Sequence, residues 1–227
     1  MTLHPKRRWT IAAIFAFAMG YAEAAVVYYL RTMVDRIQPY QPNPLPDIPA
    51  LALPELAREL ATMFMLATVG ALAGYTWRGR IGFALFTFGV WDIAYYLWLI
   101  PLTGWPDSIL NWDILFLIPM PWWGPVWAPV SIAFLMIAFG VLTTILELAE
   151  PPIWPRRISM ALCWIGIFLA LYTFMADAIA ALPGGPEAVR TVLPQQFNWM
   201  LFVFAWVLMS VPIFDMTRQL ATRYTAD

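Results

Sequence analysis

The chain has 227 residues, of which 62% are hydrophobic and only 12% are charged, and its mean hydropathy is +0.69. A soluble domain carries about 25% charged residues, so we expect most of this surface to face lipid. The net charge of −1 offers no basis for contacts with phosphates, and we expect no nucleic-acid partner.

The rare residues argue against several cofactors. The only histidine, His4, precedes the first apolar segment, so one chain cannot hold a haem between two intramembrane histidines. A single cysteine, Cys163, argues against an iron–sulfur cluster or thiolate zinc site within one chain. The only lysine, Lys6, also lies before the first apolar segment, which argues against a buried retinal Schiff base. Carboxylates alone are compatible with a hard cation, but we predict no metal site.

Six apolar segments are long enough to cross a bilayer, for which about 20 helical residues suffice. In chain order they span about 9–30, 55–75, 81–100, 126–147, 158–178 and 197–216. The first segment also resembles a signal peptide ending at Ala22-Glu23-Ala24, but its apolar run continues to Leu30. The sequence therefore predicts an all-α, polytopic membrane bundle of six transmembrane helices, forming one integral domain over 1–227.

Three longer connections are rich in proline or tryptophan: 31–54, 101–125 and 179–196. Six prolines fall between Pro39 and Pro54, so we expect an extended loop there. The apolar stretch 114–125 is too short and too rich in proline for a regular span. We expect it to be an interfacial or re-entrant piece, which requires protein to cover its backbone polar groups.

The distribution of basic residues predicts the orientation. Nine lie in the N-terminal head, the turns at 76–80 and 150–157, and the C-terminal tail, against four on the other side. Because basic residues concentrate on the cytoplasmic side, both termini are predicted to be cytoplasmic and the three longer loops to face outward. We expect the location to be the bacterial inner (cytoplasmic) membrane.

With this topology, three acids come to similar depths in the outer half of the bilayer. Glu23, Glu59 and Asp92 differ in depth by about 10 Å or less at 1.5 Å per residue. An ionisable residue inside a span is a functional-site hypothesis by default, and Asp92 lies near the middle of its span. The predicted ligand, proton or cation site consists of Glu23, Glu59, Asp92, Arg58, Tyr95, Tyr96 and Trp91, with Glu55, Arg31 and Asp113 in secondary positions.

Within this site the three acids would titrate or bind, Arg58 would be their counter-charge, and Tyr95 and Tyr96 would form a wall or relay. Such a site is suited to handling protons or cations, or to binding a cationic or hydroxylated amphiphile against aromatic faces. The structural interpretation is that Arg58 and Glu59 pair with Glu23 or Asp92 only to fix helix packing. Glu55 and Asp113 then have ordinary interfacial or capping roles, and most tryptophans form an interfacial belt.

A second functional class is a non-catalytic subunit or scaffold of a larger membrane complex. It predicts partner membrane subunits and tolerance of changes at Asp92. No nucleotide-binding loop and no hydrolase motif is present, and whether the protein is an enzyme stays open.

Two resemblances follow from particular motifs. The runs ARELAT (57–62), WDIAYYLW (91–98) and GWPDSILNWDILFLIPMPWWGPVWAP (104–129) resemble a family of uncharacterised bacterial multi-pass membrane proteins. More distantly, Glu23 with Tyr28-Tyr29, Glu59 with Thr62, and Trp91-Asp92-Ile-Ala-Tyr95 resemble the emopamil-binding-protein-like (EXPERA) superfamily. That resemblance implies a pocket for a cationic or sterol-like amphiphile and, as a third alternative, a lipid or sterol isomerase. The chain lacks the superfamily's early histidine and has two further spans.

Overall fold

The computed structural model describes residues 5–41, 49–117 and 119–224. Six of its helices are long and apolar enough to cross a membrane, which indicates a multi-pass membrane protein with a predominantly helical fold. These helices are α1 (Pro5–Met33), α2 (Pro49–Ala73), α3 (Trp77–Thr103), α4 (Trp127–Ile145), α5 (Arg157–Ala181) and α7 (Trp199–Tyr224). Each corresponds to one segment predicted from the sequence, with differences at the ends.

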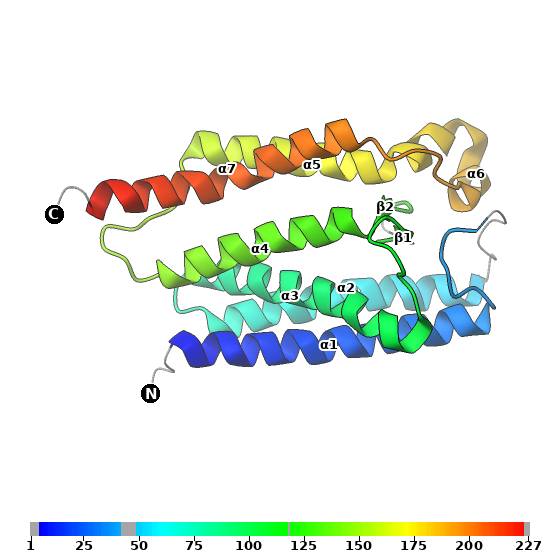
Figure 1. The fold of residues 1–227 in the computed structure, drawn as a ribbon, viewed down its shortest axis with the longest axis horizontal. Helices are drawn as coiled ribbons and strands as arrows, with labels where there is room; N and C mark the ends of the chain where they lie inside the picture. The colour runs from blue at the N-terminus through cyan, green and yellow to red at the C-terminus, as the bar shows by residue number, and fades with distance from the viewer. Residues whose placement is uncertain (1–4, 42–48, 118, 225–227) are drawn as a thin grey trace.

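The six helices run alternately in opposite directions (Figure 1). We call the end at which α1 begins and α7 ends the terminal end, and the opposite end the loop end. Helix α3 is central to the first four helices because it packs against α1, α2 and α4. Helices α5 and α7 form a separate pair, which contacts α4 mainly through α7. The bundle is therefore a four-helix group and a two-helix group joined by a narrower interface.

Small residues allow α1 to lie close to α3. Ala16 and Ala24 are fully buried on α1, and a Cβ added at Gly20 would lie 2.8 Å from the Cβ of Ala94. The small-residue series Ala16, Gly20 and Ala24 therefore lies on the face of α1 that contacts α3. Gly70, which forms a Gly-xxx-Gly pair with Gly74, likewise lies against the first turns of α3.

The helix ends shorten two of the predicted loops. α1 continues to Met33 and α2 begins at Pro49, so the loop predicted at 31–54 is shorter than expected. α3 continues through Pro101 to Thr103 and ends at Gly104, whose φ of 72° is a left-handed conformation that glycine adopts without strain. Pro101 therefore lies inside α3 and does not mark the end of the helix. The predicted loop at 179–196 contains a short 3₁₀ turn, η1 (Leu182–Gly184), and helix α6 (Gly185–Thr191).

The stretch 101–125 contains an antiparallel β-ribbon that the sequence did not predict. Strand β1 (Trp112–Ile114) pairs with β2 (Trp123–Pro125), with Asp113 opposite Gly124. Beyond the strands, the Leu115 N–H donates to the Trp122 carbonyl at 2.8 Å, and the Trp122 N–H donates to Phe116 at 2.9 Å. These bonds satisfy several backbone groups of the ribbon, as buried irregular backbone requires.

Candidate functional site

A cavity of about 1110 Å³ lies towards the loop end, between the two groups of helices. Its walls come from helices α1 to α5, and the β-ribbon and α6 also contribute. All ten residues predicted for the site line this one cavity: Glu23, Arg31, Glu55, Arg58, Glu59, Trp91, Asp92, Tyr95, Tyr96 and Asp113. The residues are thus brought together as expected, whereas their function stays a prediction.

Arg58 of α2 joins two of the acids. Its guanidinium forms an ion pair with Glu23 of α1 and a second one, at 2.7 Å, with Glu55 one turn earlier on α2. The Thr62 hydroxyl donates to Glu23 at 3.3 Å. Arg58 pairs with these acids rather than with Glu59, because consecutive residues on a helix point in different directions. Glu23 and Glu55 therefore share one guanidinium, whose single positive charge balances one of the two carboxylates.

Glu59 holds the β-ribbon in place. Its side chain is buried, with 6% of the residue exposed, and its carboxylate accepts the backbone N–H of Leu117 at 3.0 Å. A buried carboxylate that accepts a backbone N–H fixes the position of the donor chain. Glu59 thus anchors the segment between β1 and β2 to α2, and this segment forms part of the cavity wall.

Asp92 differs from the other predicted acids. It lies near the middle of α3, where its side chain is half-buried and lines the cavity. Its Oδ2 atom is inaccessible to solvent and has no hydrogen-bond partner. Within the described parts of the chain, no Arg, Lys or His nitrogen lies within ion-pair distance of Asp92. Burial of an unpaired carboxylate at this depth costs folding free energy. The described part of the chain supplies no partner that would offset this cost.

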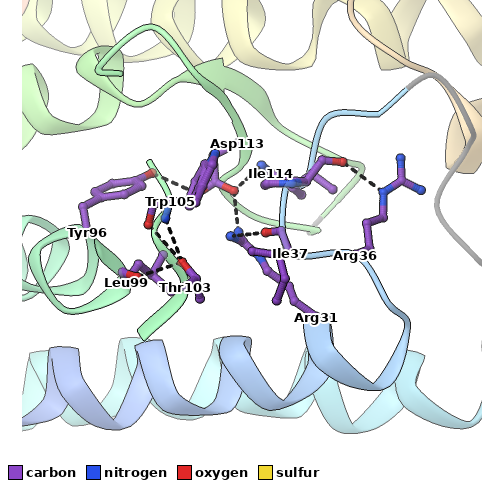
Figure 2. A network of polar contacts seen from close by, with 10 residues as sticks. Arg31, Arg36, Ile37, Tyr96, Leu99, Thr103, Trp105, Asp113 and Ile114 are labelled. Atoms are coloured by element: carbon purple, nitrogen blue, oxygen red, sulfur yellow. Dashed lines mark hydrogen bonds and ion pairs between the residues drawn. The ribbon is translucent and has the colours of Figure 1, made fainter. Parts of the chain in front are cut away.

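Asp113 is the centre of a polar network at the loop end (Figure 2). Its carboxylate accepts the Arg31 guanidinium at 2.9 Å, the Tyr96 hydroxyl at 3.2 Å and the N–H of Ile114 at 2.9 Å. The guanidinium also lies 4.4 Å from the centre of the Trp105 ring. Asp113 is 1% exposed, so the interfacial or capping role expected for it is not the one it has.

Two opposing influences act on the ionisation of Asp113. Burial raises the pKa of this carboxyl above its usual value, and the Arg31 guanidinium and the Tyr96 hydroxyl lower it again. The ion pair is thus what holds the charged form in a buried position. Arg31, predicted as a secondary residue of the site, thus has Asp113 on the ribbon as its partner.

The aromatic residues of the site form its wall beside Asp92. Trp91 is 6% exposed and contacts Phe88 edge to face, with ring centres 5.4 Å apart. Its indole N–H is buried without a hydrogen-bond partner. Tyr95 contacts Tyr96 in the same geometry at 5.0 Å. Trp91 is thus a buried wall residue and not a member of an interfacial belt.

A second buried ion pair, at the terminal end, was not predicted. The Arg8 guanidinium pairs with Glu147 and donates to the carbonyl of Ala73 at 2.8 Å. Glu147 also accepts the N–H of Tyr75 at 3.1 Å. Arg8 belongs to the N-terminal head, which was predicted as part of a basic cytoplasmic side, but it is buried, as is Glu147. The two residues are 139 positions apart, so no local sequence pattern indicates the pair. The only signal in the sequence is that both residues belong to the same end of the predicted bundle.

No group of three or more His, Cys, Asp and Glu side chains is arranged to hold a metal ion in the part of the chain that the structure describes. Comparison with known protein families, with curated proteins and with solved structures finds no match for this chain. The two resemblances noted from sequence motifs therefore stay predictions, and the case for a function rests on the cavity itself.

Proposed function

We propose that this protein binds an amphiphile in the cavity between its two groups of helices, with Asp92 as the contact for a hydrogen-bond-donating head group. The observation that carries the proposal is an unpaired carboxylate opening onto a large cavity with largely apolar walls. A carboxylate without a partner favours a ligand that brings a donor to it.

The chemistry of the walls supports an amphiphile over a hydrated ion. Away from the charged groups, the cavity is lined by aliphatic side chains such as Leu85, Ile132, Met136, Ile167 and Leu171. Known small-molecule sites are likewise mostly apolar, with few polar groups that fix the orientation of the ligand. An alkyl chain would pack against the aliphatic wall, and its head would lie near Asp92 and the ribbon.

The arrangement of α2 and α5 supports entry from the bilayer. Both helices line the cavity, yet in the described structure α2 packs on α3 and α1, whereas α5 packs on α7. A ligand dissolved in the membrane would therefore enter sideways between α2 and α5, without crossing the β-ribbon.

The distribution of charge supports an orientation in which the loop end lies on the outer side of the bacterial inner membrane. Arg8 is buried against Glu147, so it no longer counts as a loop charge. Eight of the nine basic residues on the terminal side remain, against four on the other side. The terminal end would then be cytoplasmic, and the cavity would take its ligand from the outer leaflet.

The test is the binding of two long-chain probes, tritiated hexadecylamine and tritiated 1-hexadecanol, to protein in lipid nanodiscs. Wild-type protein is expected to bind at least one probe, with displacement by the unlabelled probe but not by hexadecane. Asp92→Ala should weaken this binding about tenfold or more, since it removes the acceptor of a buried hydrogen bond. Asp107→Asn is the matched control, because Asp107 is exposed and does not line the cavity.

Two results would contradict the proposal: binding of neither probe above empty nanodiscs, or equal binding by wild type and Asp92→Ala. If the protein also co-purified with other membrane proteins, the scaffold interpretation would replace it.

A further inference from the structure

The charged and the apolar linings of the cavity are separated along its length. Its charged side chains come from the loop-end halves of α1 and α2, the segment after α1, the β-ribbon and α6, and Asp92 supplies the charge on α3. Further towards the terminal end, α3 contributes Leu85 and Phe88 to the lining, and α4 contributes Met136. We call the part of the cavity that these three apolar residues line the apolar end.

The packing of α3 against α4 gives the depth of the apolar end. A Cβ added at Gly89 would lie 2.8 Å from the side chain of Ile137, so Met136 lies near the level of Gly89. Leu85 precedes Asp92 by seven positions on α3, which is about 10 Å along the axis at about 1.5 Å per residue. Measured from Asp92, the apolar end is therefore about two helical turns deep.

The helices meet beyond Leu85 and close the cavity there. A Cβ added at Gly140 of α4 would lie 2.5 Å from the carbonyl oxygen of Gly82 of α3, so these two helices are in direct backbone contact. Met216 of α7 is fully buried in a cluster against which Phe139 of α4 packs, and this joins the two groups of helices. Among the described residues, those that precede Leu85 on α3 do not line the cavity.

A closed apolar end of this depth limits the length of a linear chain. A carbon chain with bonds of about 1.5 Å and angles of about 111° advances roughly 1.25 Å per carbon. A head group at Asp92 therefore leaves space for about eight carbons in the direction of Leu85. A longer chain would have to turn and leave the cavity sideways between α2 and α5, with its remainder in the bilayer.

We propose that the apolar end receives the alkyl chain of the bound amphiphile, and that Leu85 and Met136 determine the preferred chain length of about eight carbons. This inference rests on the proposed function and narrows its ligand to a medium-chain amphiphile. Because lipid tails are as apolar as leucine, a methylene gains little on moving from the bilayer into the cavity. Affinity relative to the bilayer should therefore be constant for chains that fit and decrease for chains that must turn.

The experiment measures the dependence of binding on chain length in lipid nanodiscs. Tritiated 1-octanol is displaced by a series of unlabelled 1-alkanols from 1-butanol to 1-hexadecanol, and each concentration is expressed as a mole fraction of the lipid. The alkanols up to 1-octanol are expected to compete equally with the tracer. 1-Dodecanol and 1-hexadecanol should compete at least roughly threefold less well, because their chains exceed the depth of the apolar end.

Two substitutions at Leu85 should shift the preferred length in opposite directions. Leu85→Trp partly fills the apolar end, so 1-octanol should bind at least roughly threefold more weakly while 1-butanol keeps its affinity. Leu85→Ala deepens the apolar end by about two carbons, so 1-decanol should then compete as well as 1-octanol does. A purely structural role of Leu85 would change the binding of all chain lengths alike. Met136→Trp, on the other wall, should act as Leu85→Trp does.

Leu72→Trp is the matched control. Leu72 lies on α2, is 82% exposed and does not line the cavity. This variant should keep the chain-length dependence of wild type. Circular dichroism and size-exclusion chromatography of each variant would show whether it is folded. If Leu85→Trp does not fold, Leu85→Ala and Met136→Trp still test the assigned role.

The outcomes separate this inference from the proposed function. Equal competition by all the alkanols, with no shift in the Leu85 variants, would overturn the role of the apolar end. It would retain the amphiphile site if Asp92→Ala still weakened the binding of 1-octanol. Binding of none of the alkanols would overturn both. The same shift in Leu72→Trp as in Leu85→Trp would show that the added ring acts through the fold, and the role assigned to Leu85 would be wrong.

Discussion

The guanidinium of Arg31 lies 2.9 Å from the carboxylate of Asp113, across 82 residues of sequence. Arg31 is in the last turn of α1 and Asp113 is in the middle of β1. Tyr96 of α3 donates to the same carboxylate. The pair therefore joins two helices to the β-ribbon that forms the loop-end wall of the cavity.

Removal of Arg31 should be strongly destabilising. Arg31→Leu leaves a carboxylate that is 1% exposed without its counter-charge, and breaking a buried pair in this way costs about 3–5 kcal/mol. The free energy of unfolding, measured by detergent titration in bicelles, would report the loss. The double variant Arg31→Leu/Asp113→Asn should recover a large part of it. If the double variant lost the sum of the two single effects, the two side chains would not be coupled.

The stability of Arg31→Leu should also depend on pH. Without Arg31, burial raises the pKa of Asp113 further above its value of about 3.9 in an unfolded chain. The folded state then binds a proton more tightly than the unfolded state, so stability is fully present below the unfolded pKa. It is lost as the pH rises through the folded pKa. The unfolding temperature of Arg31→Leu should therefore fall above about pH 4 relative to that of wild type.

Asp113→Asn provides the control for this pH dependence. In the Arg31→Leu/Asp113→Asn variant, the carboxyl is absent and the added decrease should disappear. An undiminished decrease in the double variant would assign the titration to another group.

A substitution at Gly79 should act through the second ion pair. A Cβ at Gly79 would overlap the carboxylate of Glu147, so Gly79→Ala must displace the partner of Arg8. We expect a loss of about 2–4 kcal/mol, because the pair is buried at the terminal end. Detergent titration would measure it. Gly79→Ala should cost much less in a Glu147→Ala background, where space is free; an equal cost in both backgrounds would contradict this contact.

Replacement of Asp92 should stabilise the empty protein. The side chain is unpaired, and an unsatisfied buried polar group costs about 1–3 kcal/mol. Asp92→Ala should therefore raise the unfolding free energy by roughly 1 kcal/mol, after the lost packing of the side chain is included. Asp113→Ala should do the opposite, since that carboxylate is fully paired. A marked loss of stability in Asp92→Ala would show that Asp92 has a structural partner.

The helical part of the fold could be predicted because each span is a long apolar run, which has few alternative structures in a bilayer. The loop end could not be read in the same way. The strands β1 and β2 are three residues each and lie among prolines and tryptophans, so no alternating pattern marks them. Their pairing depends on contacts between distant residues, and local propensity indicates little about it.

The sequence indicated which residues line the cavity, but it did not indicate which of them pair with one another. Depth along predicted spans was enough to bring Glu23, Glu59 and Asp92 to one cavity. The choice of partners depends on helix rotation and on the ribbon, which sequence periodicity does not determine. Arg58 pairs with Glu23, which is one of the two partners that the helix-packing interpretation predicts. Asp113, for which that interpretation predicts an interfacial role, is the most buried acid of the site.

The most direct test of the central claim is equilibrium binding of 1-hexadecanol and hexadecylamine to wild type and Asp92→Ala in the same nanodiscs. The account predicts saturable binding to wild type and an affinity reduced about tenfold or more in a variant that is at least as stable. Equal, or equally absent, binding by the two proteins would contradict the claim that Asp92 receives a ligand in this cavity.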